Sequence, residues 1–157
     1  MATQIVDPQV HIDPVTVQVV PALEFLKDIA ITAAEGGISY WALTRKYQWR
    51  ESFGDARARC GPEETSSNVE AQRQDLPFPL LVIQDAEASD DTEAILVTPE
   101  HIRKGLQLAL TPGIMNPESN TVKSAFRGLM EMDAGHVDSD AADCIVQLGV
   151  FGQVVYG

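Results

Sequence analysis

Residues 78–98 read FPLLVIQDAEASDDTEAILVT. The continuous apolar run over residues 78–85 is typical of a buried central strand, and a second strand is indicated over Glu93–Thr98. The segment between them, residues 86–92, is an acidic turn. Because two short strands joined by a turn of this length usually pair side by side, we predict a hairpin at the centre of an antiparallel sheet.

Helices are predicted on both sides of this hairpin. Thr98-Pro99-Glu100 is typical of a helix start, because a capping hydroxyl precedes a proline in the first turn and an acid near the positive end of the helix dipole. Two more helices are expected over about 120–132 and about 139–148. The inward face predicted for the first of these consists of Val122, Ala125, Phe126, Leu129 and Met130.

The first third of the chain predicts one helix and one strand region. Residues 21–35 have helical periodicity and end at Gly36-Gly37, a typical helix stop. Residues 38–50 read ISYWALTRKYQWR and favour one long strand, or two strands broken near residues 43–45. Since Trp41 and Trp49 lie on opposite sides of that break, we expect one of them, but not both, to be buried.

These elements predict a single α+β domain over residues 1–157. Its antiparallel sheet should have about three to five strands, covered by about four helices. Residues 1–17 are expected to form an extended arm, and residues 54–77 a long polar loop. The apolar tail over residues 150–157 is expected to close as a short strand.

Charge is distributed unevenly along the chain. The formal net charge is −12; the first 60 residues contribute seven acids and six bases, and residues 61–157 contribute sixteen acids and five bases. Such an excess of acids disfavours direct binding to nucleic acid or to anionic membranes. A protein partner with a basic surface is favoured instead.

The acids after residue 80 form two groups of candidate interface residues. One surrounds the predicted hairpin turn and the other precedes and enters the last helix. These acids either keep the protein soluble and stabilise helix N-termini, or form a surface that imitates the phosphates of a nucleic-acid duplex. The two groups are Asp85, Glu87, Asp90, Asp91 and Glu93, and Glu131, Asp133, Asp138, Asp140 and Asp143.

A compact segment before residue 60 combines aromatic and basic residues. Its aromatics can cover the core, anchor a protein interface or stack on nucleic-acid bases, and all three alternatives stay open. The charge of the whole chain weighs against the last. The candidate interface residues are Tyr40, Trp41, Arg45, Tyr47, Trp49 and Arg50.

Signatures of catalysis and metal binding are weak. The three histidines are scattered, no serine lies in a GxSxG context, and residues 138–143 lack the glycine and the distal glutamate of a calcium loop. Cys60 and Cys144 are expected to be free thiols in a reducing compartment. We therefore predict no catalytic residue, metal or cofactor, and a cytoplasmic location without a signal peptide or membrane span.

Two stretches resemble small acidic proteins of bacteriophages and related mobile elements. They are EGGISYWA at 35–42 with YQW at 47–49, and DAADCIVQ at 140–147 continuing to FG and YG at 151–152 and 156–157. The resemblance implies an accessory protein that acts in a bacterial host cell. It favours a protein that binds and inhibits a host nucleic-acid-handling or defence protein, by nucleic-acid mimicry.

Two alternatives remain open at this point. In the first alternative, the chain is a small enzyme or binds a nucleotide-like ligand, and its pocket lies near residues 40–49. Otherwise it is a structural or assembly protein, which would include a homo-oligomer.

Overall fold

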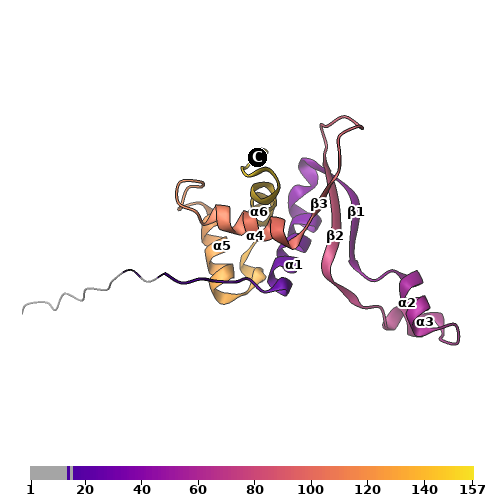
Figure 1. Cartoon of the computed structure of the whole chain (residues 1–157). Coiled ribbons are helices and arrows are strands. Elements are labelled where there is room, and N and C mark those ends of the chain that lie inside the picture. Colours follow the sequence, from indigo (N-terminus) through magenta and orange to yellow (C-terminus); the bar gives the residue numbers. More distant parts are fainter. Residues whose placement is uncertain (1–13, 15) are drawn as a thin grey trace, which may run out of the picture.

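The computed structural model describes residues 14 and 16–157 and has the predicted α+β architecture (Figure 1). Its three-stranded antiparallel sheet has the order β1–β2–β3, formed by Ala42–Arg50, Asp75–Asp85 and Ile95–Val97. Leu81 pairs with Val97 and Ile83 with Ile95, which confirms the antiparallel hairpin. The predicted apolar run is the central strand, with the side chains of Leu81 and Ile83 buried.

Four helices form a body beside the sheet (Figure 1). They are α1 (Leu23–Thr32), α4 (Pro99–Ala109), α5 (Asn120–Glu131) and α6 (Ser139–Phe151), close to the ranges that the sequence predicts. The start of α4 also agrees with the prediction, because the Thr98 hydroxyl accepts a hydrogen bond from the His101 backbone N–H. Most of α6 is buried, so this helix lies at the centre of the core.

Two glycines let α4 and α6 cross at very short range. A Cβ atom added to Gly105 of α4 would lie 1.9 Å from the Ile145 carbonyl oxygen of α6. A Cβ atom added to Gly149 of α6 would lie 2.0 Å from the His101 carbonyl oxygen of α4. Each helix therefore rests its backbone on the other, which only glycine permits at these two positions.

The helix predicted to stop at Gly36-Gly37 does not simply end there, because the backbone changes to other helical forms. After α1 the chain continues through a π-helical turn, Ala33–Gly37, and a 3₁₀ turn, Ile38–Tyr40, before β1 begins. Gly37 is needed because a Cβ atom there would lie 2.6 Å from the Ser139 carbonyl oxygen. The start of α6 thus packs directly on this turn.

The break predicted in β1 is a β-bulge. The register with β2 shifts between Thr44 and Lys46, so Arg45 is the extra residue. Trp41 is 3% exposed and Trp49 is 40% exposed, so one tryptophan is buried and the other is not, as expected.

Three local expectations are wrong. The predicted loop over residues 54–77 contains α2 (Phe53–Cys60), α3 (Ser66–Ala71) and the start of β2. The tail after α6 forms no strand. Phe126 and Met130 do not face inward, since their exposed fractions are 58% and 55%. Most of the expected extended arm lies outside the described residues.

The two helices in the expected loop have local stabilisation that periodicity does not reveal. Ser52 and Thr65 cap their N-termini, and the Arg57 guanidinium donates to the Glu64 carbonyl oxygen between them. β2 tolerates Pro77 and Pro79 because β3 pairs only with residues 81–83. Beyond that stretch one edge of β2 is unpaired within the described chain, so a missing N–H costs little.

Candidate functional site

The hairpin between β2 and β3 carries a concentrated negative charge. Its loop extends beyond the helices at the top of Figure 1. Four of its acids are exposed and the fifth, Asp85, is half-buried; we call these five residues, Asp85, Glu87, Asp90, Asp91 and Glu93, the acidic hairpin. No lysine or arginine lies between Arg73 and Arg103, so the hairpin segment itself contains no base.

A buried glutamine orders this loop. The Gln84 side chain is 4% exposed, and its amide nitrogen donates to the carbonyl oxygens of Ser89 (3.2 Å) and Thr92 (2.8 Å). Its amide oxygen accepts a hydrogen bond from Arg45 Nε at 2.7 Å. The bulge in β1 therefore has a second role, because it places a guanidinium against the residue that holds the acidic hairpin.

Asp85 links the acidic hairpin to the end of the chain. Its carboxylate accepts hydrogen bonds from the Tyr156 hydroxyl and from the Glu87 backbone N–H. These bonds, the Tyr156 bond above all, lower the pKa of Asp85, while the same carboxylate raises the pKa of Tyr156 to about 12. Asp85 thus stays ionised at neutral pH.

Beneath the acidic hairpin lies a buried polar cluster around Asp143. The Asp143 carboxylate accepts hydrogen bonds from Trp41 Nε1 (2.7 Å), the Tyr40 hydroxyl (2.7 Å) and the Gln147 amide (3.0 Å). The Tyr156 ring stacks on the Trp41 ring with centroids 5.0 Å apart. Gln147 completes the cluster by accepting from the backbone N–H groups of Val155 and Tyr156.

This cluster is structural. Every buried side-chain nitrogen or oxygen in the described part of the chain has a hydrogen-bond partner. The buried polar atoms of this cluster are therefore all engaged within the protein. Trp41 and Asp143, which the sequence placed among the interface residues, are both buried and lie outside any surface a partner could reach. They join β1 to α6 and hold the C-terminal tail.

The remaining aromatic and basic candidates do not form one site. Tyr47 donates from its hydroxyl to Glu35 at 3.1 Å, and burial together with this bond raises its pKa to about 12. Arg50 donates to the Arg73 carbonyl oxygen. A shallow hollow beside Trp49 lies between these groups, but Tyr40 and Trp41 line the Asp143 cluster instead. The pocket expected near residues 40–49 is therefore divided.

The second acidic group is dispersed as well. Glu131 and Asp133 both lie against His136, and Glu131 also accepts from Arg127. Asp138 caps α6 by accepting from the Ala141 N–H. Asp140 is exposed.

Three of the residues around α5 have side chains of the kind that bind metal ions. Glu131, Asp133 and His136 bring three potential ligand atoms within 4.8 Å of one another. Since Arg127 already neutralises Glu131, an ion-pair cluster accounts for the arrangement. Residues 138–143 form no cation loop, because Asp138 is a helix cap and Asp143 a core residue.

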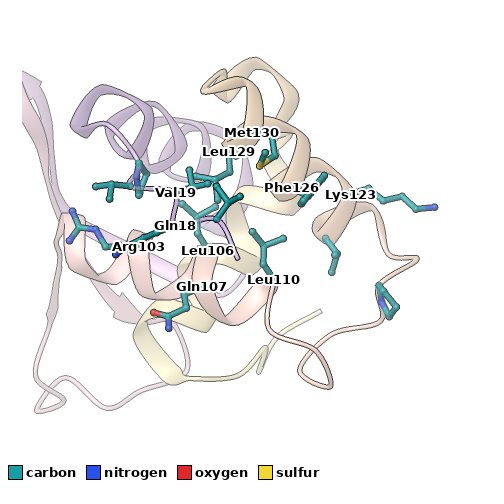
Figure 2. Close-up of a pocket in the computed structure, with 15 residues that line it drawn as sticks. Gln18, Val19, Arg103, Leu106, Gln107, Leu110, Lys123, Phe126, Leu129 and Met130 are labelled. Atoms are coloured by element: carbon teal, nitrogen blue, oxygen red, sulfur yellow. The ribbon is translucent and has the colours of Figure 1, made fainter. Parts of the chain in front are cut away.

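An apolar groove of about 840 Å³ between α4 and α5 is a surface feature that the sequence did not predict (Figure 2). The apolar stripe of α5, which the sequence predicts to face the core, in fact lines this groove with Phe126 and Met130. Among the described residues, no helix combines the length and apolar character needed to cross a membrane. No family model, curated protein or solved structure matches this chain.

Proposed function

We propose that this protein is a binding protein that uses the acidic hairpin to occupy a basic surface on a partner. The observation that carries the proposal is the ordered loop: five acids and no base within nine residues, and a buried Gln84 that hydrogen-bonds to the loop backbone. A charged loop that is already ordered loses less conformational entropy on binding than a disordered one. Its field also accelerates encounter with an opposite charge.

The partner we propose is a host protein that handles nucleic acid or takes part in defence. Such proteins bind phosphates with lysine and arginine, and a compact anionic loop competes for the same groups. The resemblance to small acidic phage proteins supports this setting by association. The protein would then act as an inhibitor by nucleic-acid mimicry, with the acidic hairpin as its contact.

The test compares two matched charge reversals. Asp90→Lys with Asp91→Lys changes the acidic hairpin, and Glu63→Lys with Glu118→Lys changes two exposed acids outside both acidic groups by the same net charge. Each variant and the parent protein would capture partners from bacterial lysate at about 50 mM and about 300 mM salt, conditions that differ strongly in screening. Mass spectrometry would quantify the captured proteins, and circular dichroism would confirm folding.

We expect the parent and the control variant to retain a nucleic-acid-binding partner at low salt, and the hairpin variant to lose it. Added duplex DNA should compete for that partner. If both folded variants capture the same proteins as the parent at both salt concentrations, the acidic hairpin serves solubility only. The exposed Trp49 and its neighbours would then become the leading interface candidate.

A further inference from the structure

The last residues of the chain are held to the body through side chains. After α6 ends at Phe151, residues 153–157, which we call the C-terminal segment, curl back at the end of this helix (Figure 1). None of their backbone groups bonds to the backbone of another described residue. Val154 and Val155 are 40% and 50% exposed, whereas Tyr156 is half-buried. Tyr156 is therefore the residue that anchors the segment.

Gln147 of α6 binds the backbone of this segment. Its amide oxygen accepts the backbone N–H groups of Val155 and Tyr156, both at 2.8 Å, and its amide nitrogen donates to the Tyr156 carbonyl oxygen at 3.1 Å. A side-chain amide that engages the N–H and the C=O of one residue pairs with it as a peptide group of a neighbouring strand would. These bonds recognise an extended backbone, whichever chain supplies it.

The Tyr156 side chain is contacted from its ring to its hydroxyl. The ring stacks on the Trp41 ring, with centroids 5.0 Å apart and an angle of 5° between the planes. It also meets the Phe151 ring at 64°, with centroids 6.1 Å apart. The hydroxyl donates to the Asp85 carboxylate. Stacking and this bond together favour a tyrosine over other residues at this position.

The residues that contact Tyr156 are positioned independently of the C-terminal segment. Asp143 accepts hydrogen bonds from Trp41 Nε1 at 2.7 Å and from the Gln147 amide at 3.0 Å. These bonds orient Trp41 and Gln147 without any contribution from residues 153–157. Asp85 is the last residue of β2. A site whose walls are already in place loses little conformational entropy when it binds a ligand.

The C-terminal segment covers this site and is joined to α6 by a glycine. Gly152 has a φ of 76°, and a Cβ atom added to it would have no neighbour within 4 Å. Rotation at this glycine therefore meets no steric obstacle. With the segment in place Trp41 is 3% exposed and Gln147 is fully buried. Trp41 is out of the reach of a partner only while the segment stays there.

We propose that Trp41, Gln147 and Asp85 form a binding site for a tyrosine in an extended segment of a partner protein, and that the C-terminal segment occupies this site until the partner displaces it. The ligand class follows from the present occupant, since the bonds to Val155 and Tyr156 show which groups fit. The residue before the tyrosine is not selected, because the Val155 side chain is exposed. This activity goes beyond the binding of a basic surface by the acidic hairpin.

The probe is a fluorescent peptide with the sequence of residues 153–157, QVVYG, titrated against the full chain by anisotropy. It has no charged side chain, so its binding does not depend on the charge of the acidic hairpin. In the parent protein the C-terminal segment competes with the peptide. In Tyr156→Ala the site is open, and the peptide should bind at least about tenfold more tightly, because a larger fraction of the protein is competent to bind.

Two further variants separate opening of the site from a loss of folding. Val155→Pro removes one backbone N–H that Gln147 accepts and changes only an exposed side chain. It should strengthen binding of the peptide about two- to fivefold. Val154→Ala is the control, because Val154 is exposed and lies outside the site, and it should bind the peptide as the parent does. Circular dichroism would confirm that each variant is folded.

A double-mutant cycle locates the tyrosine hydroxyl. In the Tyr156→Ala background, a peptide with phenylalanine in place of tyrosine should bind about three- to tenfold more weakly, since it cannot donate to Asp85. Adding Asp85→Ala should weaken the tyrosine peptide by a similar factor and leave the phenylalanine peptide within about twofold. A peptide with alanine at this position lacks the ring that stacks on Trp41 and should show no measurable binding.

Three results would overturn the proposal. If the folded Tyr156→Ala and Val155→Pro variants bind the peptide no more tightly than the parent, the C-terminal segment does not close a binding site. Equal binding of the alanine and tyrosine peptides would show that the ring is not recognised. Equal weakening of the tyrosine and phenylalanine peptides by Asp85→Ala would show that the hydroxyl does not bind at Asp85.

Discussion

Asp143 lies in the core with its carboxylate bonded to the side chains of three other residues. Two of the donors, Tyr40 and Trp41, come from the turn before β1, more than one hundred positions away in the chain. A buried carboxylate is costly unless donors surround it, and here they do. The three hydrogen bonds therefore fix how the start of β1 meets α6.

Asp143→Asn should lower the free energy of unfolding by about 2 kcal/mol, because an amide is a weaker acceptor than a carboxylate and its NH₂ group would face another donor. Asp140→Asn is the control, and since Asp140 is exposed its effect should stay below about 1 kcal/mol. Urea unfolding followed by tryptophan fluorescence measures both values. Equal effects would mean that the buried bonds contribute no more than an exposed charge.

All three tyrosines should titrate at unusually high pH. Each donates its hydroxyl to a carboxylate, and burial or this bond raises the pKa of Tyr40, Tyr47 and Tyr156 to about 12, whereas an unfolded tyrosine has a pKa of about 10. Between these values the folded chain holds more protons than the unfolded chain. Stability is therefore fully present below about pH 10 and falls as the pH rises towards about 12.

Tyrosinate absorbance measures this directly in the folded and the urea-unfolded protein. Tyr40→Phe, Tyr47→Phe and Tyr156→Phe should each remove one part of the high-pH transition. A midpoint near 10 in the folded protein would show that the hydroxyl–carboxylate bonds do not persist in solution.

At the scale of elements, helix crossing depends on two glycines. Gly105→Ala and Gly149→Ala should each destabilise the protein by about 3 kcal/mol or more, because the added methyl group meets a backbone carbonyl that cannot rotate away. Gly54→Ala is the matched control: it lies in α2, and the nearest atom to its added Cβ is Ser52 Oγ at 3.9 Å. Thermal unfolding should show no loss for the control, since alanine favours a helix over glycine.

The same scale explains which elements the sequence could predict. The hairpin is encoded by an apolar run and the turn that follows it, and the start of α4 by a capping motif. Both signals lie in neighbouring residues, so a short stretch of sequence is sufficient to predict them. Helices α2 and α3 are short and bury little, and their caps and arginine bonds leave no periodic signal. In α5 the apolar stripe was recognised, but periodicity cannot say what covers a stripe.

The candidate site was predictable in part for a similar reason. The acids of the hairpin are close in sequence, so their grouping in space follows from the turn. The second acidic group is divided because its members have different structural roles. Glu131 pairs with His136, Asp138 caps α6 and Asp143 is buried in the core. The pairing of Asp143 with Trp41 depends on tertiary packing, which a single sequence does not reveal.

The whole molecule consists of a helical body and a long β1–β2 ribbon that carries α2 and α3 at its far end (Figure 1). We expect the amides of α2 and α3 to exchange with solvent faster than those of α6. The two short helices each bury a single residue, Ala56 and Val69, whereas α6 is buried along most of its length.

Hydrogen exchange with mass spectrometry measures this difference between helices. The Val69→Ala variant tests whether α2 and α3 open separately from the helical body. The variant should accelerate exchange in α2 and α3 while leaving α6 unchanged. Equal acceleration in α6 would mean that the molecule unfolds as one cooperative unit.

The register of the ribbon has a consequence for the modularity of the chain. Because Arg50 pairs with Asp75, residues 51–74 are in effect an insertion into a β-hairpin whose two ends lie about one strand spacing apart. A tight turn could replace them without altering the path of the remaining backbone. Any small domain whose termini are equally close could be grafted at the same place, so the ribbon is a natural attachment point for engineering a second activity into this protein.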